Sequence, residues 1–305
     1  MRIYETQIIL TDEHFINWFD RLCWVQFSDI FSERTIRIFS RDDKVIPDDT
    51  SALVHLAGKA HDLNNIISPQ DYYRVNYELT KKVYDDFLLS QAKVFITLSS
   101  VKAVADEVIV SLCENISAHP STAFGKSKLL AEQYILSKEI PDGKRVYVLR
   151  PCMIHGPGNK GNLNLLYKMV SKNIPWPLGA FDNKRSFCSI DNLMFIFKEL
   201  IEREDIPSGI YNVADDEPLS TNELIGLIAQ SQNRKSKIWN FSKRFIAGVA
   251  SIGDKLHLPL STERLQKLTS SYVVSNAKLK SAIGKPLPVS SREGLLKTFK
   301  SFNSK

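Results

Sequence analysis

The chain has 305 residues, enough to bury a sizeable core in one large domain or in a large domain with a smaller lobe. Hydrophobic residues make up 43% of it and charged residues 24%, the proportions of an ordinary globular protein. The formal charge of +6 is modest, with some excess of basic residues after about residue 230. No motif that reads nucleic acid accompanies this charge, so we expect no nucleic-acid partner.

The cysteines and the apolar runs indicate the compartment in which the protein is expected. Cys23, Cys113, Cys152 and Cys188 are scattered without CxxC spacing or nearby histidine clusters, which indicates free thiols and predicts no metal site. No apolar run approaches the roughly 18 residues that a membrane span needs. The N-terminus lacks the basic-then-apolar layout of a signal peptide. We therefore expect a cytoplasmic protein with no membrane partner.

Strand-like and helix-like segments alternate over the first two-thirds of the chain. Short apolar runs predict strands, and longer amphipathic stretches predict helices. The predicted elements are a strand at 8–10, a helix at 15–24, strands at 35–39 and 52–57, a helix at 72–89, a strand at 93–98, a helix at 122–137 and a strand at 145–150. This alternation predicts an α/β fold in which helices cover both faces of a doubly wound parallel sheet.

The character of the sequence changes after Arg150. Pro, Gly and Asn cluster at residues 151–162 and again at 174–183, and helical patterns separated by Pro- and Gly-containing turns follow. We predict a first domain at 1–150 and a smaller lobe at 151–305. The cleft between two such units is the expected ligand site.

The most informative stretch runs from Ser121 to Lys128 and reads Ser-Thr-Ala-Phe-Gly-Lys-Ser-Lys. With the following Leu-Leu-Ala-Glu it resembles the Tyr-Gly-x-Ser-Lys helix signature of the extended short-chain dehydrogenase/reductase family. Phe124 stands at the tyrosine position, and Lys128 follows one helical turn later on the same face.

The resemblance implies acid/base chemistry at the position that Phe124 occupies. In this family the tyrosine phenol is the acid/base that moves a proton at a sugar oxygen, and the lysine lowers its pKa. Phe124 has no ionisable proton. Because general acid/base catalysis contributes roughly 100- to 10,000-fold in rate, we expect redox or epimerase chemistry to be impaired or lost.

Further segments resemble, in order, the nucleotide-sugar branch of the family, the NAD-dependent epimerases and dehydratases. They are residues 54–58, 73–80, 98–101, 149–158, 184–192 and 209–214. The resemblance implies a Rossmann-like first domain of the dinucleotide-binding type and a mainly substrate-binding lobe, with residues 184–214 returning to the first domain. It also implies NAD or NADP as cofactor, a UDP-sugar-type substrate of surface polysaccharide metabolism, and a homodimer formed through the helices that start near Tyr73 and Thr122.

Positions that match the family's motifs supply the candidate site residues. The catalytic candidates are Ser99, Ser100 and Lys128, with Val101 left open as an alternative register for the hydroxyl position. The cofactor-binding candidates are Arg41, Ala57, Gly58, Asn76, Lys128 and Pro151. The substrate-binding candidates are His155, Asn162, Arg185 and Arg264, the two arginines because a guanidinium fork suits diphosphate oxygens.

The N-terminus departs from the family pattern. Where the family has Thr-Gly-x-x-Gly-x-x-Gly, this chain has residues 11–17, Thr-Asp-Glu-His-Phe-Ile-Asn, without a glycine. Asp12 is a preferred N-cap residue that would take the N–H groups a phosphate needs, and Glu13 adds to the repulsion of a pyrophosphate. We therefore predict a self-capped helix start without ligand. In the segment Ser40-Arg41-Asp42-Asp43, Arg41 suits an NADP phosphate and an acid suits an NAD ribose, so the choice of cofactor stays open.

Three hypotheses remain open from the sequence. The first is an active NAD(P)-dependent UDP-sugar epimerase or reductase with an unusual N-terminus and proton donor. The second is a non-catalytic member that binds a nucleotide sugar or serves as a partner subunit. The third, an aberrant first 50 residues on an ordinary enzyme, does not explain Phe124.

Overall fold

The structure is a computed structural model. It describes residues 5–9, 36–39, 46–48, 50–59, 68–159, 162–256 and 261–302, with the backbone alone at 5–9, 36–39, 162, 255 and 256. The segment 11–17 and Arg41 lie outside the described residues. The self-capped turn and the role of Arg41 therefore stay predictions.

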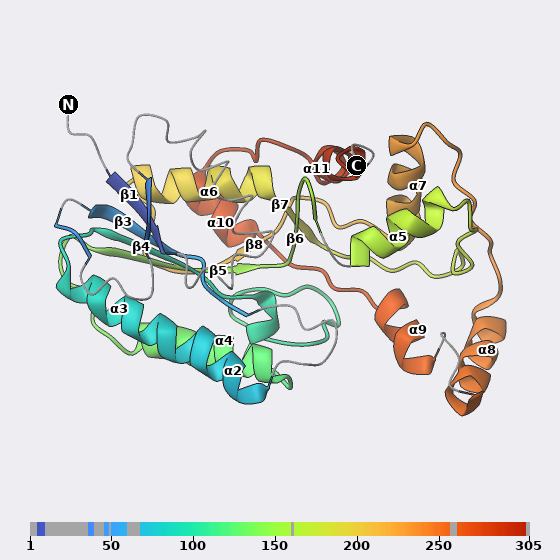
Figure 1. The fold of residues 1–305 in the computed structure, drawn as a ribbon, viewed down its shortest axis with the longest axis horizontal. Helices are drawn as coiled ribbons and strands as arrows, with labels where there is room; N and C mark the ends of the chain where they lie inside the picture. Colours follow the sequence, from blue (N-terminus) through green and yellow to red (C-terminus); the bar gives the residue numbers. More distant parts are fainter. Residues whose placement is uncertain are drawn as a thin grey trace.

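A parallel sheet of six strands forms the centre of the first domain (Figure 1). Its strands are β1 (Glu5–Ile9), β2 (Ile36–Phe39), β3 (Thr50–His55), β4 (Val94–Leu98), β5 (Arg145–Pro151) and β8 (Gly209–Val213). They lie in the order β2-β1-β3-β4-β5-β8, and every neighbouring pair is parallel. The predicted doubly wound α/β sheet is confirmed. The strand order reverses between β1 and β3, and open α/β sheets bind ligands at the carboxyl ends beside such a point.

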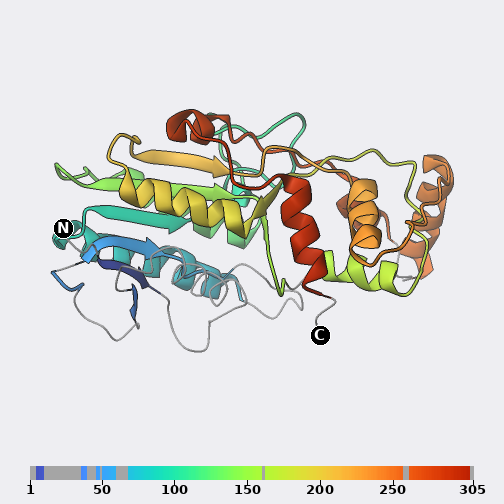
Figure 2. The same ribbon diagram turned by 90° about the horizontal axis from the view of Figure 1, so that it is seen from above.

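Helices cover both faces of this sheet (Figures 1 and 2). One face carries α2 (Pro69–Tyr73), α3 (Leu79–Leu89) and α4 (Ala123–Leu136), with a π-helical turn η2 (Arg74–Glu78) between α2 and α3. The other carries α6 (Ile190–Glu202) and α10 (Ala277–Ile283). Side chains of the central strands alternate between the two cores, so that Phe95 packs with Phe87 while Ile96 packs with Phe197.

The remaining elements form a lobe beside the sheet, at the end away from β1 (Figure 1). They are the short parallel pair β6 (Met153–His155) and β7 (Phe187–Ser189), and the helices α5 (Asn162–Ser171), α7 (Thr221–Ser231), α8 (Lys243–Leu256), α9 (Thr262–Thr269) and α11 (Ser291–Lys300). A separate apolar cluster, with Trp176, Ile228 and Phe299, fills the interior of the lobe. The lobe thus has a core of its own, and it also packs against the core of the sheet through Ile154 of β6 and Cys188 of β7.

A glycine in α4 is required by close packing. A Cβ on Gly125 would overlap the carbonyl oxygen of Lys102 and lie 2.8 Å from the Pro120 Cβ, whereas a Cβ on Gly226 in α7 would meet nothing within 4 Å. We expect Gly125→Ala to destabilise the protein. Gly226→Ala should leave stability unchanged or raise it by about 0.5–1 kcal/mol, because alanine has the higher helix propensity. Urea denaturation of both variants is the measurement, and equal effects would contradict the packing argument.

Candidate active site

The candidate site lies where β3, β4 and α4 meet, and its central residue is Lys128. The side chain is buried, and its Nζ donates a hydrogen bond to the carbonyl oxygen of Leu98, the last residue of β4, at 2.8 Å. A Cβ on Gly58, just after β3, would lie 2.8 Å from this Nζ. Gly58 is therefore a glycine because the lysine approaches its backbone closely.

Asn76 connects the loop after β3 to α4. Its Nδ2 donates to the Lys59 carbonyl and to the Ser127 hydroxyl, both at 3.0 Å, and its Oδ1 accepts from the Lys59 N–H at 2.8 Å. The residue lies in the π-helical turn η2, and such turns recur at functional sites. Of the residues predicted to bind cofactor, the structure brings Gly58, Asn76 and Lys128 together.

Phe124 lies in the first turn of α4, one turn before Lys128. Thr122 caps the helix by accepting from the Gly125 N–H at 3.1 Å, and this cap sets where the turn begins. The Phe124 ring is half-buried and meets the Tyr72 ring of α2 edge to face, with centroids 6.1 Å apart. The position therefore holds a packed apolar ring with no proton to transfer.

The two predicted serines make local hydrogen bonds. Ser99 is buried and its hydroxyl donates to Glu132 Oε1, while Ser100 accepts from the Lys102 N–H at 3.2 Å and caps the short turn η3 (Val101–Ala103). Val101, the alternative position, is buried in the core. The hydroxyl of Ser99 thus makes its hydrogen bond within the interior of the protein.

A buried ion pair that the sequence did not predict holds α4 against β5. Arg150 donates from Nε to Glu132 Oε1 at 2.9 Å and from Nη2 to Oε2 at 2.5 Å, and both side chains are buried. This two-bond geometry is the strong form of an arginine–carboxylate pair. Glu132 follows Lys128 by one helical turn, the one signal in the sequence that could have pointed to it.

Burial shifts two cationic groups of the site toward neutrality. Desolvation lowers the pKa of Lys128 to about 8, and the charge of Glu132 opposes this shift. The pKa of His55 falls to about 3, first through burial and then through the positive charge of Lys128. Thr80 donates its hydroxyl proton to Asn76 O at 2.9 Å, so His55 Nε2 is the donor to Thr80 Oγ1, also at 2.9 Å.

A small cavity lies among these groups. Its volume is about 10 Å³, the size of one water molecule, and Asn76, Thr80, Lys128 and Glu132 contribute polar atoms to its lining. The polar lining would suit a single bridging water.

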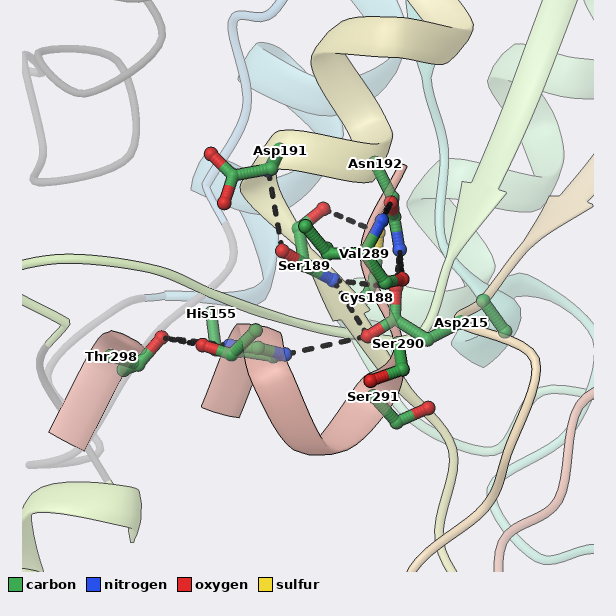
Figure 3. Close-up of polar contacts among 12 residues, drawn as sticks. His155, Cys188, Ser189, Asp191, Asn192, Asp215, Val289, Ser290, Ser291 and Thr298 are labelled. Carbon is green, nitrogen blue, oxygen red and sulfur yellow. Dashed lines mark hydrogen bonds and ion pairs between the residues drawn. The ribbon is translucent and has the colours of Figure 1, made fainter. Parts of the chain in front are cut away.

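His155, predicted to bind substrate, lies in the interior of the lobe. Its Nδ1 is 2.9 Å from Thr298 Oγ1 of α11, and its Nε2 is 3.5 Å from Asp215 Oδ2 (Figure 3). Asp215 also accepts from the Ser189 N–H at 2.9 Å and from Asn192 Nδ2 at 2.7 Å. The cluster joins α11 to β6, β7 and α6, and both His155 and Asp215 are buried.

Arg185 makes its hydrogen bonds to other residues of the lobe. Its Nε donates to the Ser270 carbonyl at 3.1 Å, and its Nη2 bonds Ser270 Oγ at 3.2 Å and the Lys267 carbonyl, at the end of α9. Burial lowers its pKa. Arg264, also on α9, is exposed. Among the described residues, no hydrogen bond or ion pair joins His155 or Arg185 to Lys128.

The other predicted site residues have the following places. Ala57 is buried after β3, Pro151 is the last residue of β5, and Asn162 begins α5, with its side chain outside the described part of the chain. Their roles stay predictions.

The buried ion pair generates a stability prediction. We expect Glu132→Gln to cost about 3–5 kcal/mol in the free energy of unfolding, because it leaves the Arg150 guanidinium buried without its carboxylate. The combined Glu132→Leu and Arg150→Met variant should recover most of that loss. Urea denaturation of the wild type and of the two variants measures both free energies of unfolding. A cost below about 1 kcal/mol for Glu132→Gln would contradict the assignment.

The low pKa of His55 generates a pH prediction. Below pH 6.5 the unfolded chain binds a proton at His55, whereas the native protein binds it only near pH 3. The free energy of unfolding therefore falls as the pH falls from 6.5 toward 3. His55→Gln can keep the bond to Thr80 without this proton uptake. Between pH 7 and about pH 4.5 the variant should lose about 2 kcal/mol less than the wild type. Urea unfolding at the two pH values tests this, with His119→Gln, at an exposed position, as control.

Comparison with known proteins supports the resemblance of the sequence motifs. The family model "NAD dependent epimerase/dehydratase family" matches residues 23–214. A UDP-glucose 4-epimerase of Vibrio cholerae is 29% identical over 267 residues, covering 83% of this chain and 77% of the relative. An N-acetyl-alpha-D-glucosaminyl-diphospho-ditrans,octacis-undecaprenol 4-epimerase of Escherichia coli O157:H7 is 29% identical over 172 residues, covering 55% of this chain and 52% of the relative.

Solved structures share the fold at low identity. A UDP-N-acetylglucosamine 4-epimerase from Bacillus cereus matches with a TM-score of 0.73 and 17% identity, covering 99% of this chain and 100% of that one. WbmG of Bordetella bronchiseptica, in complex with NAD and UDP, matches with a TM-score of 0.71 and 12% identity, covering 99% and 96%. With the motifs and the family match, these findings place the chain in the NAD-dependent epimerase/dehydratase family of extended short-chain dehydrogenases/reductases.

Proposed function

We propose that this chain is a nucleotide-sugar member of its family whose redox and epimerase chemistry is impaired or lost. The observation that carries the proposal is Phe124, which stands one turn before Lys128 and packs its ring against Tyr72. The family's proton donor requires a phenol at this place, and a phenyl ring cannot replace it.

Lys128 supports the proposal that the described end of the site would face the nicotinamide ribose of NAD or NADP. An ammonium group has three hydrogens to donate, and at Lys128 the described residues account for one of them, in the bond to Leu98 O. Lys128 would hold the ribose, and Gly58 leaves room for the Lys128 side chain itself. When bound, the dinucleotide supplies a hydride acceptor. The pyrophosphate would face residues 11–17, for which the sequence predicts a self-capped turn, so binding is proposed to be weak.

The chain's own residues would position a substrate without moving its proton. Lys128 stays buried beside Asn76, and Ser99 gives its hydroxyl hydrogen to Glu132. The missing phenol alone accounts for a loss of roughly 100- to 10,000-fold. This arrangement supports a non-catalytic role, in which the protein binds a nucleotide sugar or acts as a partner subunit.

An active enzyme with a different proton donor is the second candidate. The supporting observation is the phenol-bearing Tyr72, whose ring lies against Phe124 at 6.1 Å between centroids. Lys128, whose pKa burial lowers to about 8, keeps the same position in this second candidate. Tyr72 would then replace the missing acid/base from the neighbouring helix.

The substrate class and assembly extend from the relatives. We propose a sugar linked to a diphosphate, of the UDP-sugar type, because one relative is a UDP-glucose epimerase and another a sugar-diphospho-undecaprenol epimerase. We also propose that the protein is cytoplasmic and acts in surface-polysaccharide metabolism. A homodimer through α3 and α4 has support in the exposed apolar side chains Leu89, Leu130 and Leu136 on these helices.

The proposal predicts a gain of function from one substitution. Phe124→Tyr should raise the epimerisation rate of UDP-glucose or UDP-N-acetylglucosamine, with NAD present, by on the order of 100-fold above a near-zero wild type. The further change Lys128→Met should remove the gain. Mass-spectrometric detection of the epimer is the readout, with calorimetric titration of NAD and UDP in parallel.

The same assay separates the two candidates. Robust turnover by the unaltered chain would overturn the proposal, and its loss in Tyr72→Phe would favour the second candidate. If calorimetry finds no NAD binding in Phe124→Tyr, the defect lies at the phosphate end of the site, and restoring the glycine loop is the next variant.

A further inference from the structure

The far end of the lobe carries a group of exposed aromatic side chains. Trp239 and Phe245 are 53% and 57% exposed, and Phe241 between them is also exposed. Their rings contact one another in a row, at 5.8 Å between Trp239 and Phe241 and 5.6 Å between Phe241 and Phe245. Helix α8, which includes Phe245, lies at the extreme end of the molecule, away from the sheet (Figures 1 and 2).

Helix α8 has a second apolar face that the lobe does not cover. Ile246 and Ala250 are buried in the core of the lobe. Phe245, Val249 and Ile252 follow one another at intervals of four and three residues, so they share a helix face. This face continues the aromatic row and is exposed, with Ile252 at 55%. No described residue buries it, so packing of the lobe does not explain its apolar composition.

The segment that carries this surface is strongly basic. Residues 224–253 contain no Asp or Glu, and the basic residues of the segment are Arg234, Lys235, Lys237, Lys243 and Arg244. All five are exposed. The whole chain, in contrast, has 40 basic and 34 acidic residues. The aromatic row and the apolar face of α8 are thus bordered by an excess of cations, and the next acidic residue along the chain is Asp254, near the end of α8.

We propose that this surface, formed by Trp239, Phe241, Phe245, Val249 and Ile252 with the basic residues of 234–244, docks the protein on an anionic phospholipid bilayer. A basic amphipathic helix with aromatic residues on its apolar face lies in the plane of the interface, where its rings enter the headgroup boundary. Lysines and arginines near the surface are attracted to anionic lipids. Protein interfaces are depleted in lysine, which makes a bilayer the better match for this composition than a protein partner.

The docking surface goes beyond the proposed function and does not depend on it. No helix in the described part of the chain is long and apolar enough to cross a membrane, and a docked helix needs no such length. The absence of a membrane-spanning run in the sequence predicted no membrane partner, and a helix that lies on a bilayer needs no such run. Only the fold shows which apolar face of α8 is left uncovered.

Vesicle co-sedimentation of the full chain tests the proposal. Phosphatidylcholine vesicles with about one third phosphatidylglycerol are compared with pure phosphatidylcholine. We expect binding to the anionic vesicles, with a blue shift of Trp239 fluorescence measured against Trp239→Phe. The combined change Phe245→Ser and Ile252→Ser, and separately Lys243→Glu and Arg244→Glu, should each weaken binding by on the order of tenfold.

Matched controls make the result decisive. Ile109→Ser and Val110→Ser, at exposed apolar positions outside the surface, should bind as the wild type does. No binding to anionic vesicles, or binding that the surface variants leave unchanged, would overturn the proposal. Self-association that Phe245→Ser and Ile252→Ser abolish, without vesicle binding, would overturn it as well and assign the face to a second copy of the chain.

Discussion

The fold depends on how it accommodates charge in the layer between α4 and the ends of β4 and β5. Lys128, Glu132 and Arg150 are all buried there, and a buried charge is tolerated when it is paired or hydrogen-bonded. Arg150 and Glu132 form two direct bonds, and Lys128 bonds the end of β4. These contacts fix α4 against the sheet and so set the position of Phe124.

The same arrangement explains how a family site can persist without the family's proton donor. Lys128, Asn76 and Gly58 are bound into the fold through backbone and side-chain contacts that stabilise it whether or not chemistry occurs. The phenyl ring of Phe124 packs against Tyr72 without the phenol. Selection on stability alone would retain Asn76, whereas burial disfavours the charged form of Lys128.

The lobe is organised by a second buried polar group. His155 and Asp215 connect α11 with β6, β7 and α6, and Arg185 satisfies carbonyls at the end of α9. His155 and Arg185 had been predicted to bind substrate, and the structure gives them partners within the protein. Arg185 and His155 thus hold together the lobe that presents α8 at its far end.

The sequence by itself determined the alternation of strands and helices, the family, and the spacing of Phe124 and Lys128 on one helix, because these depend on local periodicity. The predicted helix at 72–89 proved to be α2, η2 and α3 in succession. Only the tertiary structure decided that Ser99 bonds Glu132, that Glu132 pairs with Arg150, and that Phe245 is exposed while Ile246 is buried. Those outcomes depend on which elements meet in space, and the spacing of residues along one element does not contain that information.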